Sequence, residues 1–139
     1  LAAQLGATDT VEVPDGVGPE DLARSLGGFD IAVECSGHPN GHLLANALAR
    51  RAIINVSYCP EPYLVSQARW FGRGTTIYNP GVLASSELRA VADLYNRRLI
   101  DPEPMVSCRI APDPEEYLYA IRAIERGEIV KALIDWDAS

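Results

Sequence analysis

The sequence is poor in positive charge and in long apolar runs, and each shortage excludes a class of protein. The 12 Lys and Arg residues are outnumbered by 19 Asp and Glu residues, which gives a net charge of −7. Nucleic-acid backbones and anionic membrane surfaces attract an excess of cations, so we expect neither nucleic acid nor membrane as a partner. No apolar run approaches the roughly 20 residues of a transmembrane helix. The sequence also shows no basic segment followed by an apolar stretch, which is the pattern of a signal peptide.

Cysteine is also scarce, with Cys35, Cys59 and Cys108 at wide spacings. A small disulfide-bonded secreted domain has an even number of cysteines, so three favour a reducing cytoplasm. The 139 residues suit one domain with one core, and 47% hydrophobic and 22% charged residues are ordinary for a globular protein. We therefore expect a single cytoplasmic domain over residues 1–139.

Short apolar runs alternate with helical patterns along the chain. Continuous apolar or β-branched runs predict strands at 10–13, 31–33, 52–56, 75–78, 105–110 and 130–136. Apolar spacing, first-turn prolines and closing glycines predict helices at 19–26, 42–49, 62–71, 88–95 and 113–126, and a helix tail at 1–7. This alternation indicates an α/β fold with a mainly parallel sheet covered by helices on both faces.

The segment FDIAVECSGHPN, residues 29–40, stands out because a buried strand ends there in a tight polar loop. The apolar run stops at Glu34, and Gly37 and Pro39 then impose a turn. In α/β sheets ligands bind at the carboxyl ends of the strands. The loop after Val33 and the loop SYCPEP after Val56 both lie at such ends, so we expect a ligand there.

The order LGATD, FDIAVECSG, AIINVS, RGTTIYNPG and RGEIVKALIDW resembles the medium-chain dehydrogenase and reductase superfamily, which includes the zinc-type alcohol dehydrogenases. The resemblance is to the later part of that family's nucleotide-binding domain and extends over essentially the whole chain. It implies a partial Rossmann-like fold whose first strands and Gly-rich phosphate loop would precede Leu1. It further implies hydride transfer between NAD or NADP and an alcohol or carbonyl substrate in the parent enzyme, with zinc possible only in the absent upstream domain.

The resemblance also implies a set of cofactor contacts. The turn after the 31–33 strand would face the nicotinamide and its ribose, and backbone groups after the 52–56 strand would lie near the carboxamide. A lysine in RGEIVKA would reach ribose or phosphate. The implied cofactor-binding residues are Cys35, Ser36, Gly37, His38, Val56, Ser57, Tyr58 and Lys131. No catalytic and no metal-binding residue is implied in this chain. Arg50 and Arg51 stand where the family usually has Gly-Gly, and Ser57 where it usually has Gly.

Partners follow from the same resemblance. The strand from Thr75 to Tyr78 matches one that pairs with its twin across the two-fold axis of a homodimer. The 31–33 strand is expected to lack its inner neighbour. Three situations would satisfy the unpaired edge of that strand. The full protein is longer than this chain, or another copy or a partner chain covers the edge, or segment 10–13 has moved beside it. A function of a different class is a non-catalytic interaction or scaffold module that dimerises through its edge strand.

Two further patterns have competing interpretations. The stretch from Gly16 to Asp21 has the form G-x-G-x-x-D after a possible strand, which mimics a dinucleotide fingerprint. Asp21 would repel a pyrophosphate, so a turn followed by a helix is the favoured interpretation. Cys35, His38 and His42 have the spacing C-x2-H-x3-H, which zinc could use, but no fourth ligand is evident.

The adjacent Arg50 and Arg51 have two possible interpretations, a phosphate site or a solvated helix end. Cations at a helix end interact favourably with the helix dipole, so a solvated helix end is favoured there over a phosphate site.

Overall fold

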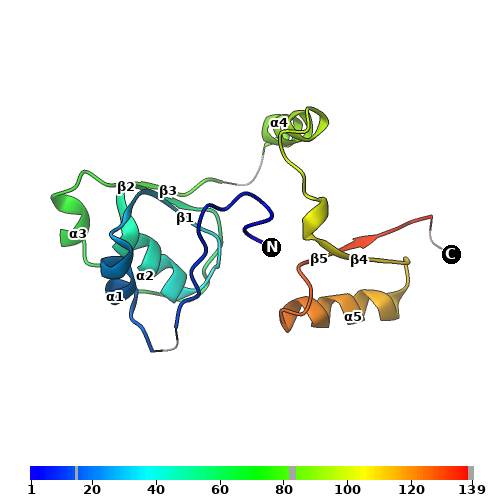
Figure 1. Ribbon diagram of the computed structural model, residues 1–139, viewed down its shortest axis with the longest axis horizontal. Coiled ribbons are helices and arrows are strands. Elements are labelled where there is room, and N and C mark those ends of the chain that lie inside the picture. Colours follow the sequence, from blue (N-terminus) through cyan, green and yellow to red (C-terminus); the bar gives the residue numbers. More distant parts are fainter. Residues whose placement is uncertain (15, 82–83, 138–139) are drawn as a thin grey trace. The chain divides into compact units, whose positions relative to one another are not determined.

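The computed structural model describes residues 1–14, 16–81 and 84–137, which belong to two compact units (Figure 1). One unit, Glu12–Val82, contains a three-stranded sheet, and we call it the three-stranded unit. The other, made of Leu1–Val11 and Leu83–Ser139, contains a two-stranded sheet and is called the two-stranded unit. Both sheets are parallel and alternate with helices, so the predicted α/β class is confirmed. A single domain over the whole chain stays a prediction.

The three-stranded unit has the strand order β1–β2–β3, with neighbours parallel. Ile53, at the centre of β2, pairs with Ala32 on one side and Ile77 on the other. The predicted strands at 31–33, 52–56 and 75–78 are confirmed within a few residues. The elements in chain order are α1 (Pro19–Leu26), β1 (Phe29–Glu34), α2 (Pro39–Leu48), β2 (Ala49–Asn55), α3 (Ala68–Phe71) and β3 (Thr76–Tyr78).

Local sequence sets the ends of the first two helices. Proline is at the first helical position of both α1 and α2, where its missing N–H costs nothing. Gly27 ends α1 with a φ of 77°, a left-handed conformation that glycine adopts without strain. The Nδ1 atom of His38 accepts a hydrogen bond from the N–H of Asn40 at 3.1 Å and so caps α2. The stretch from Gly16 to Asp21 is thus a turn leading into α1, as the favoured interpretation expected.

Small side chains let α2 lie close to the sheet. α2 contacts β1 and β2, and α1 contacts α2 in turn. Figure 1 shows both helices on one side of the strands. The buried cluster between α2 and the sheet consists of Ala32, Ala45, Ala49 and Ile53, and Ile53 is fully buried. Outward-pointing apolar residues of β1, such as Ile31 and Val33, are each 56% exposed. Within this unit the expected helical cover therefore exists on one face of β1 only.

The edge of β1 away from β2 has no strand beside it in the described part of the chain. That strand 31–33 has lost an inner neighbour stays a prediction. The predicted strand at 10–13 is wrong, because its β-branched residues find no ladder partner and Val11 and Val13 are more than half exposed. Segment 10–13 therefore forms no strand ladder with β1.

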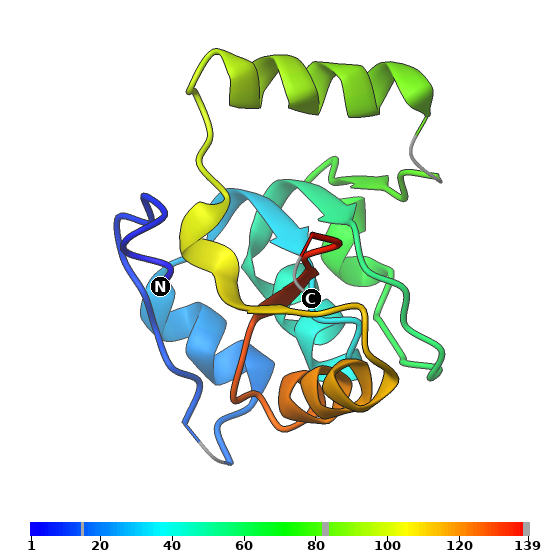
Figure 2. The ribbon, with the colours of Figure 1, turned by 90° about the vertical axis from the view of Figure 1, so that its right-hand side faces the viewer.

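The two-stranded unit contains a β–α–β arrangement. In Figure 2 the orange helix α5 connects β4 with β5, and Arg109 pairs with Leu133 in their parallel ladder. Asp113 caps α5 because its Oδ1 accepts hydrogen bonds from the N–H groups of Glu115 at 2.8 Å and Glu116 at 3.1 Å. The elements are α4 (Ser85–Asn96), a 3₁₀ turn (Glu103–Met105), β4 (Val106–Ile110), α5 (Pro114–Glu125) and β5 (Lys131–Ile134).

Three predicted segments are shorter than expected. The helix at 62–71 is reduced to α3, and the strand at 130–136 to β5. Residues 1–7 form one turn, closed by hydrogen bonds from Gly6 N to Ala3 O and from Ala7 N to Ala2 O. No helix within the described ranges is long and apolar enough to cross a membrane.

The alternation of faces along β2 predicts unequal effects of two identical truncations. Ile53→Ala is expected to lower the free energy of unfolding by about 2–5 kcal/mol, because it leaves a cavity between α2 and the sheet. Ile54→Ala, its half-buried neighbour on the opposite face, is the matched control and should cost less than about 2 kcal/mol. Urea unfolding measures both, and equal losses would contradict the assigned register.

Candidate functional site

Two loops meet at the carboxyl ends of β1 and β2. The N–H groups of Val56 and Ser57 donate to the carbonyl oxygen of Glu34 at 2.9 and 3.3 Å, which continues the strand pairing into the loops. The N–H of Gly37 donates to Ser57 Oγ at 2.9 Å. The structure thus brings together seven of the eight predicted cofactor-binding residues: Cys35, Ser36, Gly37, His38, Val56, Ser57 and Tyr58.

Gly37 permits the close approach of the two loops. Its φ of 66° is left-handed, and a Cβ added there would lie 2.7 Å from the carbonyl oxygen of Tyr58. Another residue at this position would need both a strained backbone and a displaced second loop. Other residues of both loops are exposed to solvent. In the loop after β1 these are Cys35, Ser36 and His38, and in the loop after β2 Tyr58 is 85% exposed.

The buried carboxylate of Glu34 connects the two loops through hydrogen bonds. Glu34 is only 3% exposed, and its Oε1 accepts hydrogen bonds from the N–H of Ser36 at 2.7 Å and from the Ser36 hydroxyl. Its Oε2 accepts a hydrogen bond from the Ser57 hydroxyl of the second loop. A buried charge is costly unless it is paired and hydrogen-bonded, and these donors meet that need. Ser57, which stands where the resembled family usually has Gly, is therefore part of the link between the loops.

The same contacts determine the ionisation of Glu34. Burial favours the neutral acid and raises the pKa, but hydrogen bonds from Ser36 and Ser57 outweigh it, and nearby His42 adds a smaller lowering. The pKa falls from its ordinary 4.5 to about 2. A carboxylate with this pKa is a poor proton acceptor near neutral pH. The hydrogen bonds of Glu34 instead suit a structural role, in which its carboxylate holds the two loops together.

His42 and Tyr63 extend this cluster to α2 and to the segment after β2. His42 is 3% exposed, and its Nε2 lies 3.2 Å from Glu34 Oε2, although the geometry is not that of a hydrogen bond. Its ring stacks on Tyr63 with 4.7 Å between ring centroids, and Nδ1 lies 3.3 Å from the Tyr63 hydroxyl. Burial, with smaller contributions from Cys59 and Glu34, raises the pKa of Tyr63.

Sequence reasoning did not assign Glu34, His42 or Tyr63 to one cluster. For Glu34 the sequence does contain a signal. A carboxylate at the end of a buried strand needs hydrogen-bond donors or a cation nearby, which predicts polar partners around it. In the sequence, His42 stands out only as part of the C-x2-H-x3-H pattern. In the structure Cys35 is exposed, His38 caps α2 and His42 contacts Glu34. Among residues 1–14, 16–81 and 84–137, no group of three His, Cys, Asp or Glu side chains could hold a metal ion.

A hollow adjoins the first loop. Its volume is about 380 Å³, and its lining includes apolar Val17, Leu22 and Leu44 beside polar Ser36 and His38. Small-molecule sites typically combine apolar walls with a few polar groups in this way. Lys131, the eighth predicted residue, does not belong to these loops. It is the first residue of β5, in the two-stranded unit.

Protonation of Glu34 is expected to weaken the folded state in acid. Because its folded pKa lies below 4.5, its contribution is complete above that pH and disappears as pH falls toward 2. Glu34→Gln should lower the free energy of unfolding at pH 7 by about 3 kcal/mol and flatten its acid dependence. Exposed Glu61→Gln is the matched control. Urea unfolding at pH 7, 4.5 and 3 measures the effect, and an unchanged acid dependence in Glu34→Gln would contradict this assignment.

Three comparisons with known proteins bear on the fold. No protein-family model and no curated protein sequence matches the chain significantly. Solved structures match well. Zinc-dependent alcohol dehydrogenase 2 from Streptococcus pneumonia, in its apo form, has a TM-score of 0.81 at 20% identity over 99% of this chain and 41% of its own. A putative zinc-binding dehydrogenase from Sinorhizobium meliloti 1021, bound to NADP, has a TM-score of 0.72 at 23% identity over 96% and 40%.

A third match is another dehydrogenase structure. L-idonate 5-dehydrogenase from Escherichia coli K-12 has a TM-score of 0.70 at 20% identity over 88% of this chain and 36% of its own. The chain therefore spans about 40% of the length of the structures that it matches. At these identities the likeness concerns the fold. It confirms the partial Rossmann-like α/β fold, which is similar to the fold of one part of these dehydrogenase structures.

Proposed function

We propose that this chain is the later part of the cofactor-binding region of an NAD(P)-dependent medium-chain dehydrogenase or reductase. The observation that carries the proposal is the joining of the β1 and β2 loops at the carboxyl ends of adjacent parallel strands. Parallel α/β sheets bind nucleotides at this edge. The NADP bound to the similar Sinorhizobium meliloti structure supports the same class of ligand.

The residues present fit a dinucleotide. Gly37 lets the two loops approach each other, and the adjoining hollow offers apolar walls with Ser36 and His38 as polar groups. Glu34 does not line this hollow, and its carboxylate accepts hydrogen bonds from Ser36 and Ser57. Within the three-stranded unit, the residues that we assign to the cofactor are Cys35, Ser36, Gly37, His38, Val56, Ser57 and Tyr58. The role of Lys131, in the two-stranded unit, stays a prediction.

The chain's own part in the reaction is to position the cofactor. The bound nicotinamide supplies the acceptor or donor of a hydride exchanged with an alcohol or carbonyl carbon. Gly37 and Ser57 fix the separation of the loops, while backbone groups of Val56 and Tyr58 would orient the ring's carboxamide. We assign no catalytic group and no metal ligand to the described residues.

Cofactor binding is expected to depend on the loop junction. Titration of the chain with NADH and with NADPH, followed by nicotinamide fluorescence, should show saturable binding in the micromolar range for at least one. Gly37→Ala should weaken this binding roughly tenfold, because a misplaced second loop loses about 1.4 kcal/mol of contact. Gly72→Ala is the matched control, since Gly72 has a φ of −89° and an added Cβ meets nothing within 4 Å. A folded chain that binds neither cofactor at millimolar concentration overturns the proposal.

A second candidate function is dimerisation through β3, as in a non-catalytic interaction module. The observation that favours it is the outer edge of β3, which has no ladder partner in the part of the chain that the structure describes. An unpaired strand edge is a template for another strand. Tyr78 is 63% and Ile77 37% exposed along this strand.

Disruption of the β3 edge is expected to shift a dimer toward monomer. Ile77→Pro removes a backbone donor from β3, and Ile77→Lys places a charge on the same strand while it keeps the donor. Leu64→Lys, at a position 95% exposed outside the sheet, is the matched control. Sedimentation velocity measures the species, and circular dichroism checks the fold. If both Ile77 variants keep the sedimentation coefficient of the unaltered chain, β3 is not the interface.

A further inference from the structure

Four arginines line one pocket at the amino ends of the strands. The pocket has a volume of about 830 Å³ and is lined by Arg24, Arg50, Arg69 and Arg73, together with Glu20. Arg24 lies in the last turn of α1, and Arg50 is the second residue of β2. Arg69 is the second residue of α3, and Arg73 follows the end of that helix. The pocket is thus at the opposite end of the sheet from the Glu34 cluster.

This concentration of positive charge contrasts with the rest of the chain. The net charge is −7, yet four of the 12 Lys and Arg residues line this one pocket, against the single carboxylate of Glu20. Like charges that share a hollow repel one another, and they do so less when an anion lies between them. The pocket therefore has the electrostatic character of an anion site.

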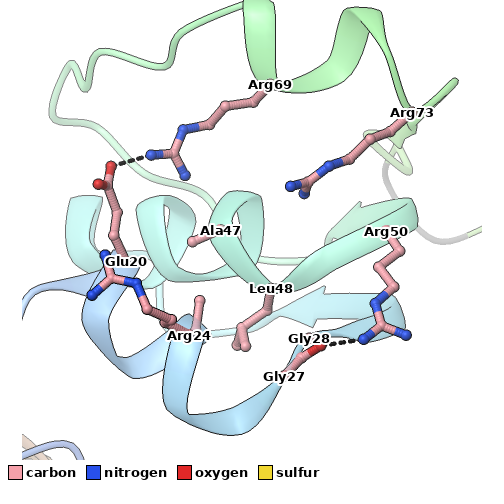
Figure 3. A pocket seen from close by; sticks show the side chains of 10 residues that line it. Glu20, Arg24, Gly27, Gly28, Ala47, Leu48, Arg50, Arg69 and Arg73 are labelled. Atoms are coloured by element: carbon pink, nitrogen blue, oxygen red, sulfur yellow. Dashed lines mark hydrogen bonds and ion pairs between the residues drawn. The ribbon is translucent and has the colours of Figure 1, made fainter.

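The arginine side chains border the pocket on two sides. Figure 3 shows Arg69 and Arg73 reaching in from the α3 side, with Arg24 and Arg50 across the hollow and Ala47 and Leu48 between them. The Trp70 indole N–H donates to Asn46 Oδ1 at 2.9 Å, which ties α3 to α2 and holds that wall in place.

Most of the guanidinium donors remain available. Arg69 pairs with Glu20, Arg24 pairs with Asp21 at 2.9 Å, and Arg50 donates to the carbonyl oxygen of Gly27. Arg73 forms no hydrogen bond or ion pair with any residue that the structure describes. A guanidinium carries five N–H donors in a planar fork, so the one or two bonds of each paired arginine leave further donors for a ligand.

Helix capping explains only part of this arrangement. The carboxyl ends of α1 and α2 lie at this edge, and cations there interact favourably with the helix dipole. Arg50, bonded to Gly27 at the end of α1, fits that role. It does not account for Arg73, whose guanidinium points into the hollow in Figure 3 without a carbonyl partner among the described residues.

We propose that this pocket binds a small anion carrying two linked phosphate groups. Guanidinium forks match phosphate oxygens in bidentate geometry, which is the reason for preferring phosphate to a single carboxylate. Arginines on two facing sides favour two phosphate groups over one. The proposal is independent of the proposed dehydrogenase function, because none of the residues assigned to the cofactor lines this pocket.

Inorganic pyrophosphate is the probe for this site. Isothermal titration of the full chain at low ionic strength should give saturable one-to-one binding, at least tenfold tighter than binding of orthophosphate or sulfate. Added salt should weaken it, because the arginine side chains are accessible to solvent and screened. Absence of saturation up to roughly 10 mM pyrophosphate, which corresponds to negligible affinity, overturns the proposal.

Matched arginine variants test the position of the site. Arg73→Gln and Arg69→Gln should each weaken pyrophosphate binding about tenfold or more, as expected for the loss of one charge-assisted contact. Arg51→Gln, exposed beside Arg50 on β2 but outside the pocket, should leave the affinity unchanged. Thermal unfolding confirms that each variant is folded. An equal loss in Arg51→Gln overturns the assignment to this pocket.

The two sites can be separated by crossing the variants, since a dinucleotide also contains a pyrophosphate. Gly37→Ala should weaken NADH or NADPH binding and leave inorganic pyrophosphate unaffected. Arg73→Gln should do the reverse. If Arg73→Gln abolishes nicotinamide cofactor binding and Gly37→Ala does not, the dehydrogenase-like site is the one that fails.

Discussion

The buried carboxylate of Glu34 is the interaction on which the arrangement of the loops depends. A charge with 3% exposure at the end of a parallel strand is stable only if donors surround it. Ser36 supplies donors from its own loop and Ser57 supplies one from the next. The two loops are therefore held in one relative position by a single group, and the residues assigned to a cofactor depend on that position.

Close packing by small residues makes this arrangement possible. Gly41 brings α2 so near to Glu34 that an added Cβ would lie 2.6 Å from its Oε1 and collide with Ser36 Oγ. Ala45 of α2 and Ala49 of β2 continue this narrow interface toward the fully buried Ile53. Larger side chains would move α2 outward and take His42 away from the carboxylate.

The two ends of the three-stranded sheet have different electrostatic character. At the carboxyl ends the anionic group is buried and satisfied, so its charge serves the structure. At the amino ends the cationic groups are more accessible and only partly paired. Charges that the fold has already neutralised add little to binding, whereas incompletely paired charges in a hollow can attract a ligand. This difference favours the arginine pocket as a place for anion recognition.

The sequence by itself determined the features that depend on neighbouring residues. Apolar runs gave β1 and β2, proline and glycine gave the ends of α1, and Asp113 gave the cap of α5. Only the tertiary structure decided what depends on residues far apart in the chain. Segment 10–13 is no strand because β-branched residues need a ladder partner, and the contact of Glu34 with Ser57 and the gathering of four arginines depend on strand register and helix packing.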